Sequence, residues 1–273
     1  MAEGLQARDA AVSALYSVLF DRRAFDDAFD KAALSRELAP RDRAFARLIA
    51  ATVLRHHGSL KATIGGFLKS PLPPAQGRLD AILLAAAAQL LILKTPPHAA
   101  ISLAVDQVRM DAGAQRFDKL TNAVLRRVSE AGGAIFAGLD PVACNIPDWL
   151  FQRWQATYGV GLARAIAVAS LAEAALDVTL KSDADFRAEQ LGGVRLATGT
   201  VRLAASGRVE ELPGFEAGAW WVQDAAAALP ARLLGDVAGK EIADLCAAPG
   251  GKTAQLAAAG ARVVAVDKSA GRL

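Results

Sequence analysis

The chain has little of what disulfide-stabilised, secreted, membrane-spanning or metal-binding proteins need. It has two cysteines, Cys144 and Cys246, and three histidines, so it lacks a disulfide framework and a repeated metal-ligand spacing. Its longest apolar run, residues 81–93, covers 13 residues and is interrupted by Gln89, which is too short to cross a bilayer. The N-terminus has no signal-peptide pattern. We therefore expect a soluble, cytoplasmic protein without a metal site.

Length and charge favour more than one domain. With 273 residues, 53% of them apolar, the chain has room for about two domains of ordinary size. The formal net charge is +3, and residues 1–140 hold 18 Lys and Arg against 14 Asp and Glu, whereas residues 141–235 hold 8 against 10. This mild basic excess at the N-terminal end is compatible with phosphate binding, although its arginines are interspersed with acids as on any solvated face.

Residues 1–138 have helical periodicity throughout. Apolar side chains recur every three or four residues in stripes that begin at Leu5, Phe45, Leu79, Ile101 and Phe117, the spacing of one helix face. The stripe from Leu79 is apolar nearly all round, which predicts a central helix. Gly132 and Gly133 are expected to end the last helix. An all-α bundle is predicted.

The pattern changes after the break at residues 138–141. A helical pair is expected from Ile146 to about Ala172, after which the period becomes two over residues 176–181. Short strands are predicted at 194–196, 200–203 and 219–222, with a short helix near 184–190, and together these indicate a small α+β module. Asp224 is placed to cap a helix over 225–234.

The most informative segment, residues 241–267, reads EIADLCAAPGGKTAQLAAAGARVVAVD. A strand from Ile242 to Cys246 enters a glycine turn, a helix follows from Lys252, and a second strand ends at Asp267, which together form a βαβ unit. Glycines let the backbone approach a ligand closely, and the helix N-terminus offers unpaired N–H groups. A carboxylate after the second strand can accept both hydroxyls of a ribose. The segment therefore predicts an adenosine-type cofactor.

Spacing decides between cofactors. Residues 251–253 match the end of a Walker A loop, but that loop needs a glycine where Cys246 stands. A G-x-G-x-x-G fingerprint is also missing, because only the adjacent pair Gly250 and Gly251 precedes Gly260 in this segment. A ribose without a pyrophosphate favours S-adenosylmethionine over NAD, and a nucleotide triphosphatase is the weaker alternative.

Three stretches resemble one enzyme family. Residues 244–253, DLCAAPGGKT, resemble the cofactor motif of the RNA cytosine-C5 methyltransferases of the NOL/NOP/Sun family, and residues 218–224, GAWWVQD, resemble the G-x-x-x-V-Q-D segment of these enzymes. The helical part, with HAAISLAV at 98–105 and TNAVLR at 121–126, is similar to the NusB-like domain of the bacterial small-subunit rRNA subgroup. One departure is residues 176–179, LDVT, where the family usually has an L-R-V-N-like strand to which an RNA contact is attributed.

The resemblance implies a multi-domain fold. Residues 1–138 would form a NusB-like helical RNA-binding domain, and residues 139–235 linker helices and a small ferredoxin-like or RRM-like α+β module. Residues 236–273 would form the N-terminal part of a Rossmann-like methyltransferase domain. The implied S-adenosylmethionine site consists of Cys246, Ala247, Ala248, Pro249, Gly250, Gly251, Lys252 and Asp267.

The implied reaction also needs a nucleophile. Enzymes of this kind add a cysteine thiolate to C6 of cytosine, so that C5 can take the methyl group; the family supplies it from Thr-Cys, with a second cysteine in Pro-Cys. Neither dipeptide occurs here. Cys246 is expected to line the cofactor site, or simply to be a small buried residue at a strand end. No catalytic residue is therefore predicted, and since the chain ends just past the second strand, we expect it to be the inactive N-terminal portion of a longer enzyme.

The expected partner is 16S rRNA, bound by a monomer without membrane contact. The alternative from another class is a non-catalytic RNA-binding module of NusB type, which the helical region alone could be.

Overall fold

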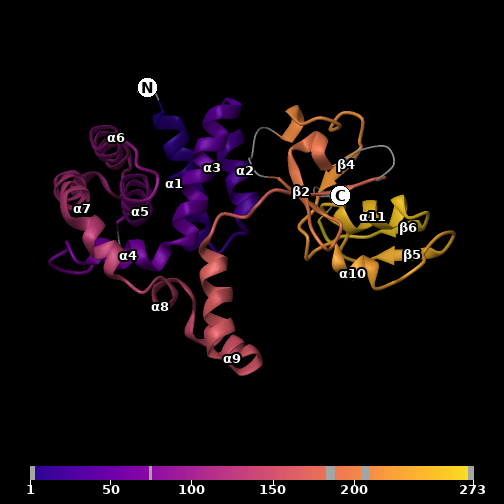
Figure 1. Cartoon of the computed structure of the whole chain (residues 1–273). Helices are drawn as coiled ribbons and strands as arrows, with labels where there is room; N and C mark the ends of the chain where they lie inside the picture. Colours follow the sequence, from indigo (N-terminus) through magenta and orange to yellow (C-terminus); the bar gives the residue numbers. More distant parts are fainter. Residues whose placement is uncertain (1–3, 74–75, 183–187, 204–208, 270–273) are drawn as a thin grey trace. The chain divides into compact units, whose positions relative to one another are not determined.

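The computed structural model describes residues 4–73, 76–182, 188–203 and 209–269. These residues fall into two compact units, residues 1–172 and residues 173–273 (Figure 1). The first is helical and the second contains the strands, as the sequence predicted.

The helical unit follows the predicted order of apolar stripes. Its helices are α1 (Leu5–Leu19), α2 (Phe25–Leu34), α3 (Pro40–Arg55), α4 (His57–Gly65), α5 (Leu79–Leu91), α6 (Pro97–Met110), α7 (Asp118–Gly138), α8 (Pro141–Asn145) and α9 (Asp148–Leu171), with a short 3₁₀ helix at Gln115–Phe117. Sequence periodicity did not single out α2 or α4. Both are short, and α4 follows α3 with only His56 between them.

The core of this unit surrounds α5. Ile82, Leu83 and Leu84 are fully buried although they point in successive directions around the helix, which confirms that α5 is central. The one polar side chain buried near its C-terminal end, Gln89, accepts a 2.7 Å hydrogen bond from Nε of Arg8 and donates to the Ala85 carbonyl. The guanidinium of Arg8 also lies over the ring of Phe45 and donates from Nη1 to the Gly4 carbonyl at 3.0 Å, so hydrogen bonds and a ring contact hold this buried cation.

The predicted helix end at Gly132–Gly133 is wrong. Helix α7 runs through both glycines to Gly138. Gly132 lies where a Cβ would come within 3.3 to 3.5 Å of side chains of Val128, Leu91 and Thr63. The glycine therefore serves close helix packing rather than chain termination.

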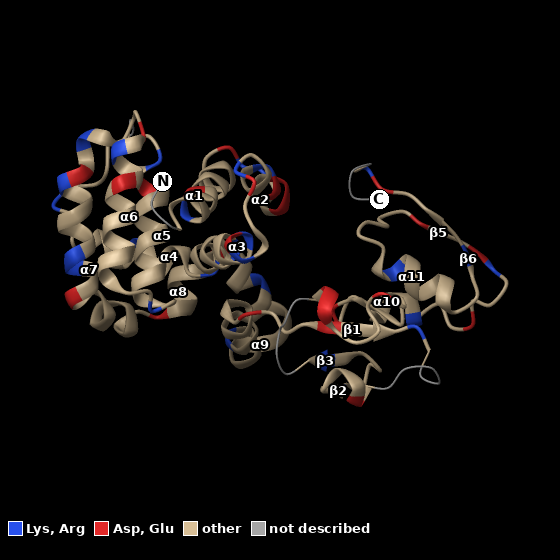
Figure 2. Cartoon of the chain, turned by 90° about the horizontal axis from the view of Figure 1, so that it is seen from above, with Lys and Arg blue, Asp and Glu red and all other residues tan. Residues whose placement is uncertain are grey.

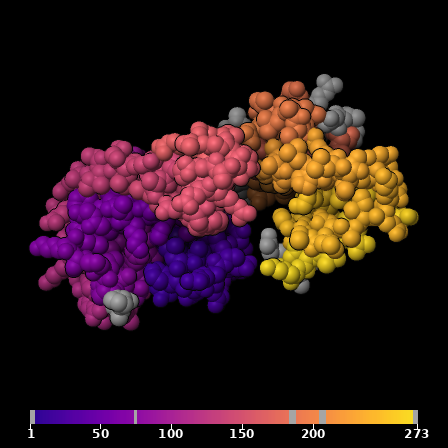
Figure 3. Space-filling model, turned by 90° about the horizontal axis from the view of Figure 1, so that it is seen from below, coloured from indigo at the N-terminus to yellow at the C-terminus, as the bar shows by residue number. Residues whose placement is uncertain are grey.

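The compact units divide after Ala172, later than the domain boundary expected at 138/139. The side chain of Asn145, at the end of α8, accepts a hydrogen bond from the Ser59 backbone N–H at 3.1 Å and donates one to the Ser59 hydroxyl at 2.7 Å. These contacts attach α8 to α4. Helix α9 then extends along the surface (pink in Figure 3) and is broken at Gly159, whose φ of 77° is left-handed, so the expected helical pair is present.

The second unit begins with a four-stranded antiparallel sheet in the order β2-β3-β1-β4. The strands β1 (Asp177–Leu180), β2 (Gly193–Arg195), β3 (Val201–Leu203) and β4 (Trp220–Val222) lie where the sequence predicted them. One face carries the core, with Val178, Val201 and Trp220 buried. Of the helix expected near 184–190, residues 183–187 lie outside the described residues, and a 3₁₀ turn is found at Ala188–Leu191.

A parallel pair of strands follows. Strands β5 (Glu241–Asp244) and β6 (Arg262–Ala265) pair in register, and α11 (Gly251–Ala258) connects them. This confirms the βαβ unit; the larger Rossmann-like domain stays a prediction. The helix expected at 225–234 is shorter than predicted: Asp224 accepts hydrogen bonds from the N–H groups of Ala226 and Ala227, but only a turn follows before α10 (Leu229–Arg232).

Candidate cofactor site

The glycine turn between β5 and α11 is anchored by the buried carboxylate of Asp244. One carboxylate oxygen accepts the backbone N–H of Cys246 at 3.3 Å, and the other accepts the hydroxyl of Thr253 at 2.8 Å. Asp244 thus ties the end of β5 to the first turn of α11 on either side of the loop. Neither it nor Thr253 was among the predicted site residues, although both lie in the motif at 244–253.

Gly250 sets the direction in which the chain enters α11. Its φ is 105°, a conformation that only glycine adopts without strain, and its N–H donates to the Ala247 carbonyl. The preceding Ala248–Pro249 peptide bond is cis. The first N–H groups of α11, beginning with Gly251 and Lys252, have no acceptor within the helix. They can therefore donate to a ligand placed at the loop.

Asp267, at the tip of β6, also closes the turn. Its carboxylate accepts the backbone N–H of Ala248 at 3.0 Å and that of Ser269 at 2.9 Å. The Ala247 N–H donates to the Val266 carbonyl beside it. These bonds orient the Asp267 carboxylate against the turn.

The eight predicted cofactor residues thus lie together: Cys246 to Gly250 form the turn, Gly251 and Lys252 begin α11, and Asp267 lies against the turn. Cys246 is exposed. Of the two alternatives that the sequence left for this residue, a small buried residue at a strand end is therefore wrong. Strand β5 ends at Asp244, two residues earlier than predicted, and this places Cys246 in the turn. Ala247 is buried in its stead.

Two glutamines connect the turn to the antiparallel sheet. Gln223, at the end of β4, is buried, and its Nε2 donates to Oε1 of Gln255 on α11 at 3.1 Å. Its Oε1 accepts the indole N–H of Trp221 at 3.0 Å. Gln255 in turn donates to the Ala228 carbonyl at 3.0 Å. Gln223 belongs to the GAWWVQD segment, but nothing in the sequence pairs it with Gln255.

The strand that departs from the family pattern carries a buried carboxylate, Asp177, which pairs with the exposed Arg202. Asp177 on β1 accepts two hydrogen bonds, at 2.8 and 2.9 Å, from Arg202, its cross-strand neighbour on β3, and one from the Ala225 N–H. The hydrogen bonds from Arg202 hold the pKa of Asp177 below its ordinary value. The arginine that pairs with Asp177 thus lies on β3, whereas the family pattern has an arginine on the strand corresponding to β1.

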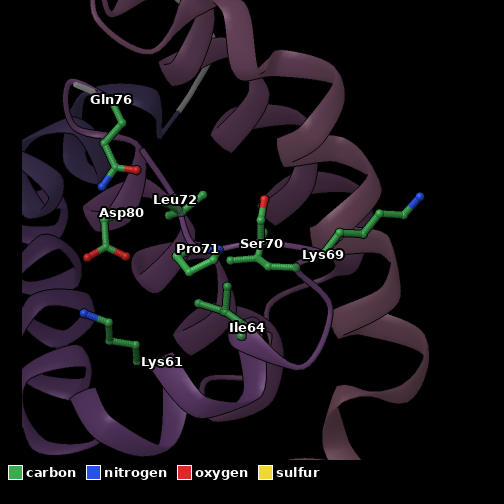
Figure 4. A pocket seen from close by; sticks show the side chains of 10 residues that line it. Lys61, Ile64, Lys69, Ser70, Pro71, Leu72, Gln76 and Asp80 are labelled. Atoms are coloured by element: carbon green, nitrogen blue, oxygen red, sulfur yellow. The ribbon is translucent and has the colours of Figure 1, made fainter. Parts of the chain in front are cut away.

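The helical unit has its own hollow. A cavity of about 460 Å³ lies between α4, the segment 67–72 and α5 (Figure 4). Ile64, Leu68 and Leu72 give it apolar walls, with Lys61 and Asp80 on one side, while Lys69 extends away. Figure 2 shows that Lys and Arg alternate with Asp and Glu over this unit, as in the pairs Arg43–Asp30 and Arg47–Asp26. Its mild basic excess is not gathered into one patch among the described residues.

Two features are absent from the residues that the structure describes. They hold no cluster of His, Cys, Asp and Glu suited to a metal ion. None of their helices combines the length and apolarity required to span a membrane.

A bundle with a NusB-type sequence, followed by an α/β region, is the class of protein that this fold defines. Residues 5–130 match the model of the NusB family. The fold of the whole chain is shared with the crystal structure of PH0851, at a TM-score of 0.62 and 17% identity, over 100% of this chain and 65% of that one. At this identity the likeness shows the fold alone.

Curated relatives that match nearly the whole chain share one name. The chain is 36% identical to the ribosomal RNA small subunit methyltransferase B of Xanthomonas campestris pv. campestris, over 93% of this chain and 59% of that protein. It is 32% identical to the protein of the same name in Vibrio cholerae, over 98% of this chain and 64% of that protein. The chain is thus similar over almost its full length to proteins of this name, and it spans less than two thirds of their length.

Proposed function

We propose that the protein methylates C5 of cytosine in 16S rRNA with S-adenosylmethionine as the methyl donor, as a cytoplasmic monomer. This chain would supply the RNA-docking regions and part of the cofactor site. The observation that carries the proposal is the glycine turn of the βαβ unit, with Gly250 left-handed and Asp267 held against the turn. The names of the curated relatives support a methyltransferase acting on ribosomal RNA.

The residues present fit this cofactor. The N–H groups of Gly251 and Lys252 can bind a polar group at the start of α11, and a carboxylate such as that of Asp267 is the acceptor that ribose hydroxyls need. The cofactor would supply an electrophilic methyl group carried on a sulfonium. Asp244 and Thr253 would maintain the shape of the turn through their mutual hydrogen bond and would not contact the cofactor. We assign no catalytic residue in this chain, because neither Cys144 nor Cys246 stands in a dipeptide of the catalytic type.

Titration calorimetry with S-adenosylmethionine tests the site. Asp267→Ala should weaken binding by about 1.5 to 3 kcal/mol, the loss expected for charge-assisted hydrogen bonds. Asp267→Asn, which retains the shape of the side chain and one carbonyl oxygen, separates cofactor binding from closure of the turn. The exposed Glu216 provides a matched control, Glu216→Ala. Unchanged affinity in Asp267→Ala would remove this residue from the site.

The same titration separates the proposal from a nucleotide triphosphatase. Lys252 has no phosphate to neutralise in a methyltransferase, so neither ATP nor GTP should bind tightly or be hydrolysed. Mg²⁺-dependent turnover that is lost in Lys252→Ala would contradict the proposal.

The alternative is a non-catalytic RNA-binding module, which the match of residues 5–130 to the NusB family favours. If the helical unit binds RNA through phosphates, affinity should fall by about 0.7 to 0.9 log units per log unit of salt for each phosphate neutralised. Fluorescence anisotropy with a 16S rRNA fragment at graded salt measures this slope. RNA binding without any S-adenosylmethionine binding would favour the module, and a flat salt response would argue against phosphate docking.

A further inference from the structure

The link between the antiparallel sheet and the glycine turn is built from side chains that the cofactor itself does not need. Strand β4 and helix α11 lie side by side within the second unit (Figure 1). Where they meet, a Cβ added to Gly251 would stand 3.4 Å from Cγ of Gln223. Gln223 therefore touches the first residue of α11, at the point where the turn delivers its N–H groups.

The amide of Gln223 is fully engaged. One of its N–H bonds is directed at Oε1 of Gln255, its Nε2 also lies 3.5 Å from the Ala227 carbonyl, and its Oε1 accepts from Trp221. Its backbone N–H donates to the Asp177 carbonyl at 3.0 Å, which fixes it to β1. At 5% exposure, these bonds form away from water, where an amide left without a partner is costly.

Gln255 completes the bridge from the other side. It lies one turn into α11, accepts from Gln223, and donates to the Ala228 carbonyl in the segment between β4 and α10. The apolar contacts beneath α11 are few, since the buried residues of the cluster there, within the described part of the chain, are Ala231, Val237 and Leu256. Directional hydrogen bonds therefore carry much of the placement of α11.

We propose that Gln223 and Gln255 are positioning residues, which set the glycine turn, and with it the cofactor, at a fixed orientation to the four-stranded sheet. The proposal rests on the proposed function for the identity of the cofactor. The coupling itself rests only on the contacts of these two side chains. Loss of the bridge frees the first turn of α11 while Asp244 still holds the end of β5.

The test uses hydrogen exchange and S-adenosylmethionine titration on the whole chain. Gln255→Leu keeps the bulk of the side chain but removes both of its hydrogen bonds. We expect amide exchange in residues 250–256 to rise about tenfold and the Kd for S-adenosylmethionine to rise about tenfold, the equivalent of one hydrogen bond. Gln255→Glu keeps an acceptor for Gln223, so its exchange rates and Kd should lie closer to those of the unaltered chain. The exposed Gln152 on α9 gives the control, Gln152→Ala.

A purely structural role predicts a different pattern. If Gln255→Leu speeds exchange in β1 and β4 as much as in α11, or if Gln255→Glu gives no rescue, the positioning role is overturned. Exchange at 250–256 that does not change in Gln255→Leu or in Gln223→Ala overturns it as well. If the unaltered chain binds no S-adenosylmethionine, the proposed function fails, and the exchange measurement still decides the coupling.

Discussion

The two units hold their shape by different means. In the helical unit a continuous core of fully buried aliphatic side chains joins α1, α3, α5 and α7, whereas the cluster beneath the βαβ unit has three buried residues among those described, none of them fully buried. The glycine turn relies instead on the carboxylates of Asp244 and Asp267 and on the amide of Gln223. Burial of apolar surface is non-directional, but hydrogen bonds fix orientation. The region proposed to hold a ligand is thus held mainly by hydrogen bonds, whereas the helical unit is held mainly by burial of apolar side chains.

The largest expected effect is in the helical core. Leu83→Ala should lower the free energy of unfolding of the helical unit by about 2 to 5 kcal/mol, because Leu83 is fully buried and the cavity cannot be refilled. Urea unfolding followed by far-ultraviolet circular dichroism at 222 nm reports mainly on this unit. Leu34→Ala, at a site that is 69% exposed, is the control. If Leu83→Ala lowers the free energy of unfolding no more than Leu34→Ala does, the helical unit is not held together by its apolar core in the way that the comparison of the two units assumes.

The second effect concerns the sheet of the other unit. Asp177→Ala should destabilise this sheet by about 2 kcal/mol, since it removes a buried acceptor of charge-assisted hydrogen bonds from Arg202 and leaves the Ala225 N–H unpaired. Hydrogen exchange resolved by peptide measures β1 and β3 separately from the helices. Faster exchange in the helical unit as well would mean that the two units unfold together.

The third effect is local to the turn. Gly250→Ala places a Cβ at φ 105°, which costs about 1 to 2 kcal/mol. Exchange should quicken in residues 246–254, with the four-stranded sheet unchanged. Gly161→Ala provides a matched control on α9, at a glycine without a positive φ and without neighbours that a Cβ would meet. An equal response to both substitutions would show that the conformation of Gly250 does not constrain the turn.

The sequence predicts the elements that apolar patterns define, but not the features that depend on tertiary packing. The central place of α5 could be predicted because apolar side chains around a whole helix have only one stable environment, the core. The strands and the βαβ unit could be predicted from alternation and from the glycine turn. Local pattern failed at Gly132, because the same residue type that ends helices also lets two helices approach, and only the packing of Leu91 and Thr63 against it distinguishes the two.

The position of the glycine turn could be predicted from the sequence, but the side-chain contacts that support it could not. The motif at 244–253 locates the turn, yet Gln223 and Gln255 lie 32 residues apart in sequence, and no periodicity relates a strand end to a helix interior. The alternative of a buried Cys246 at a strand end was wrong because the predicted strand extended two residues past the true end of β5. Side-chain networks of this kind depend on tertiary placement, which a single sequence does not specify.

The smallest expected effect is a difference in acid sensitivity between the two units. Burial, followed by the charge of Arg55, lowers the pKa of His56, and burial, followed by Lys61, lowers that of His57, each from an ordinary value of 6.5. Groups with depressed folded pKa values stabilise the fold above their ordinary pKa, and this stability is lost as pH falls through the folded value. The helical unit should therefore begin to weaken below about pH 6.5, with the histidines as the cause.

The sheet is expected to lose stability at a lower pH than the helical unit, because its titrating group is Asp177. Its pKa is depressed from an ordinary value of 3.8 by Arg202, so the contribution of this ion pair persists until the pH falls below that value. Exchange measured from pH 8 to pH 3, corrected for intrinsic rates, should show helical protection declining first. His56→Gln with His57→Gln should flatten the decline between pH 6.5 and 5, and Asp177→Asn should leave it unchanged. The prediction fails if the sheet loses protection first. It also fails if the histidine substitutions have no effect on the decline of helical protection.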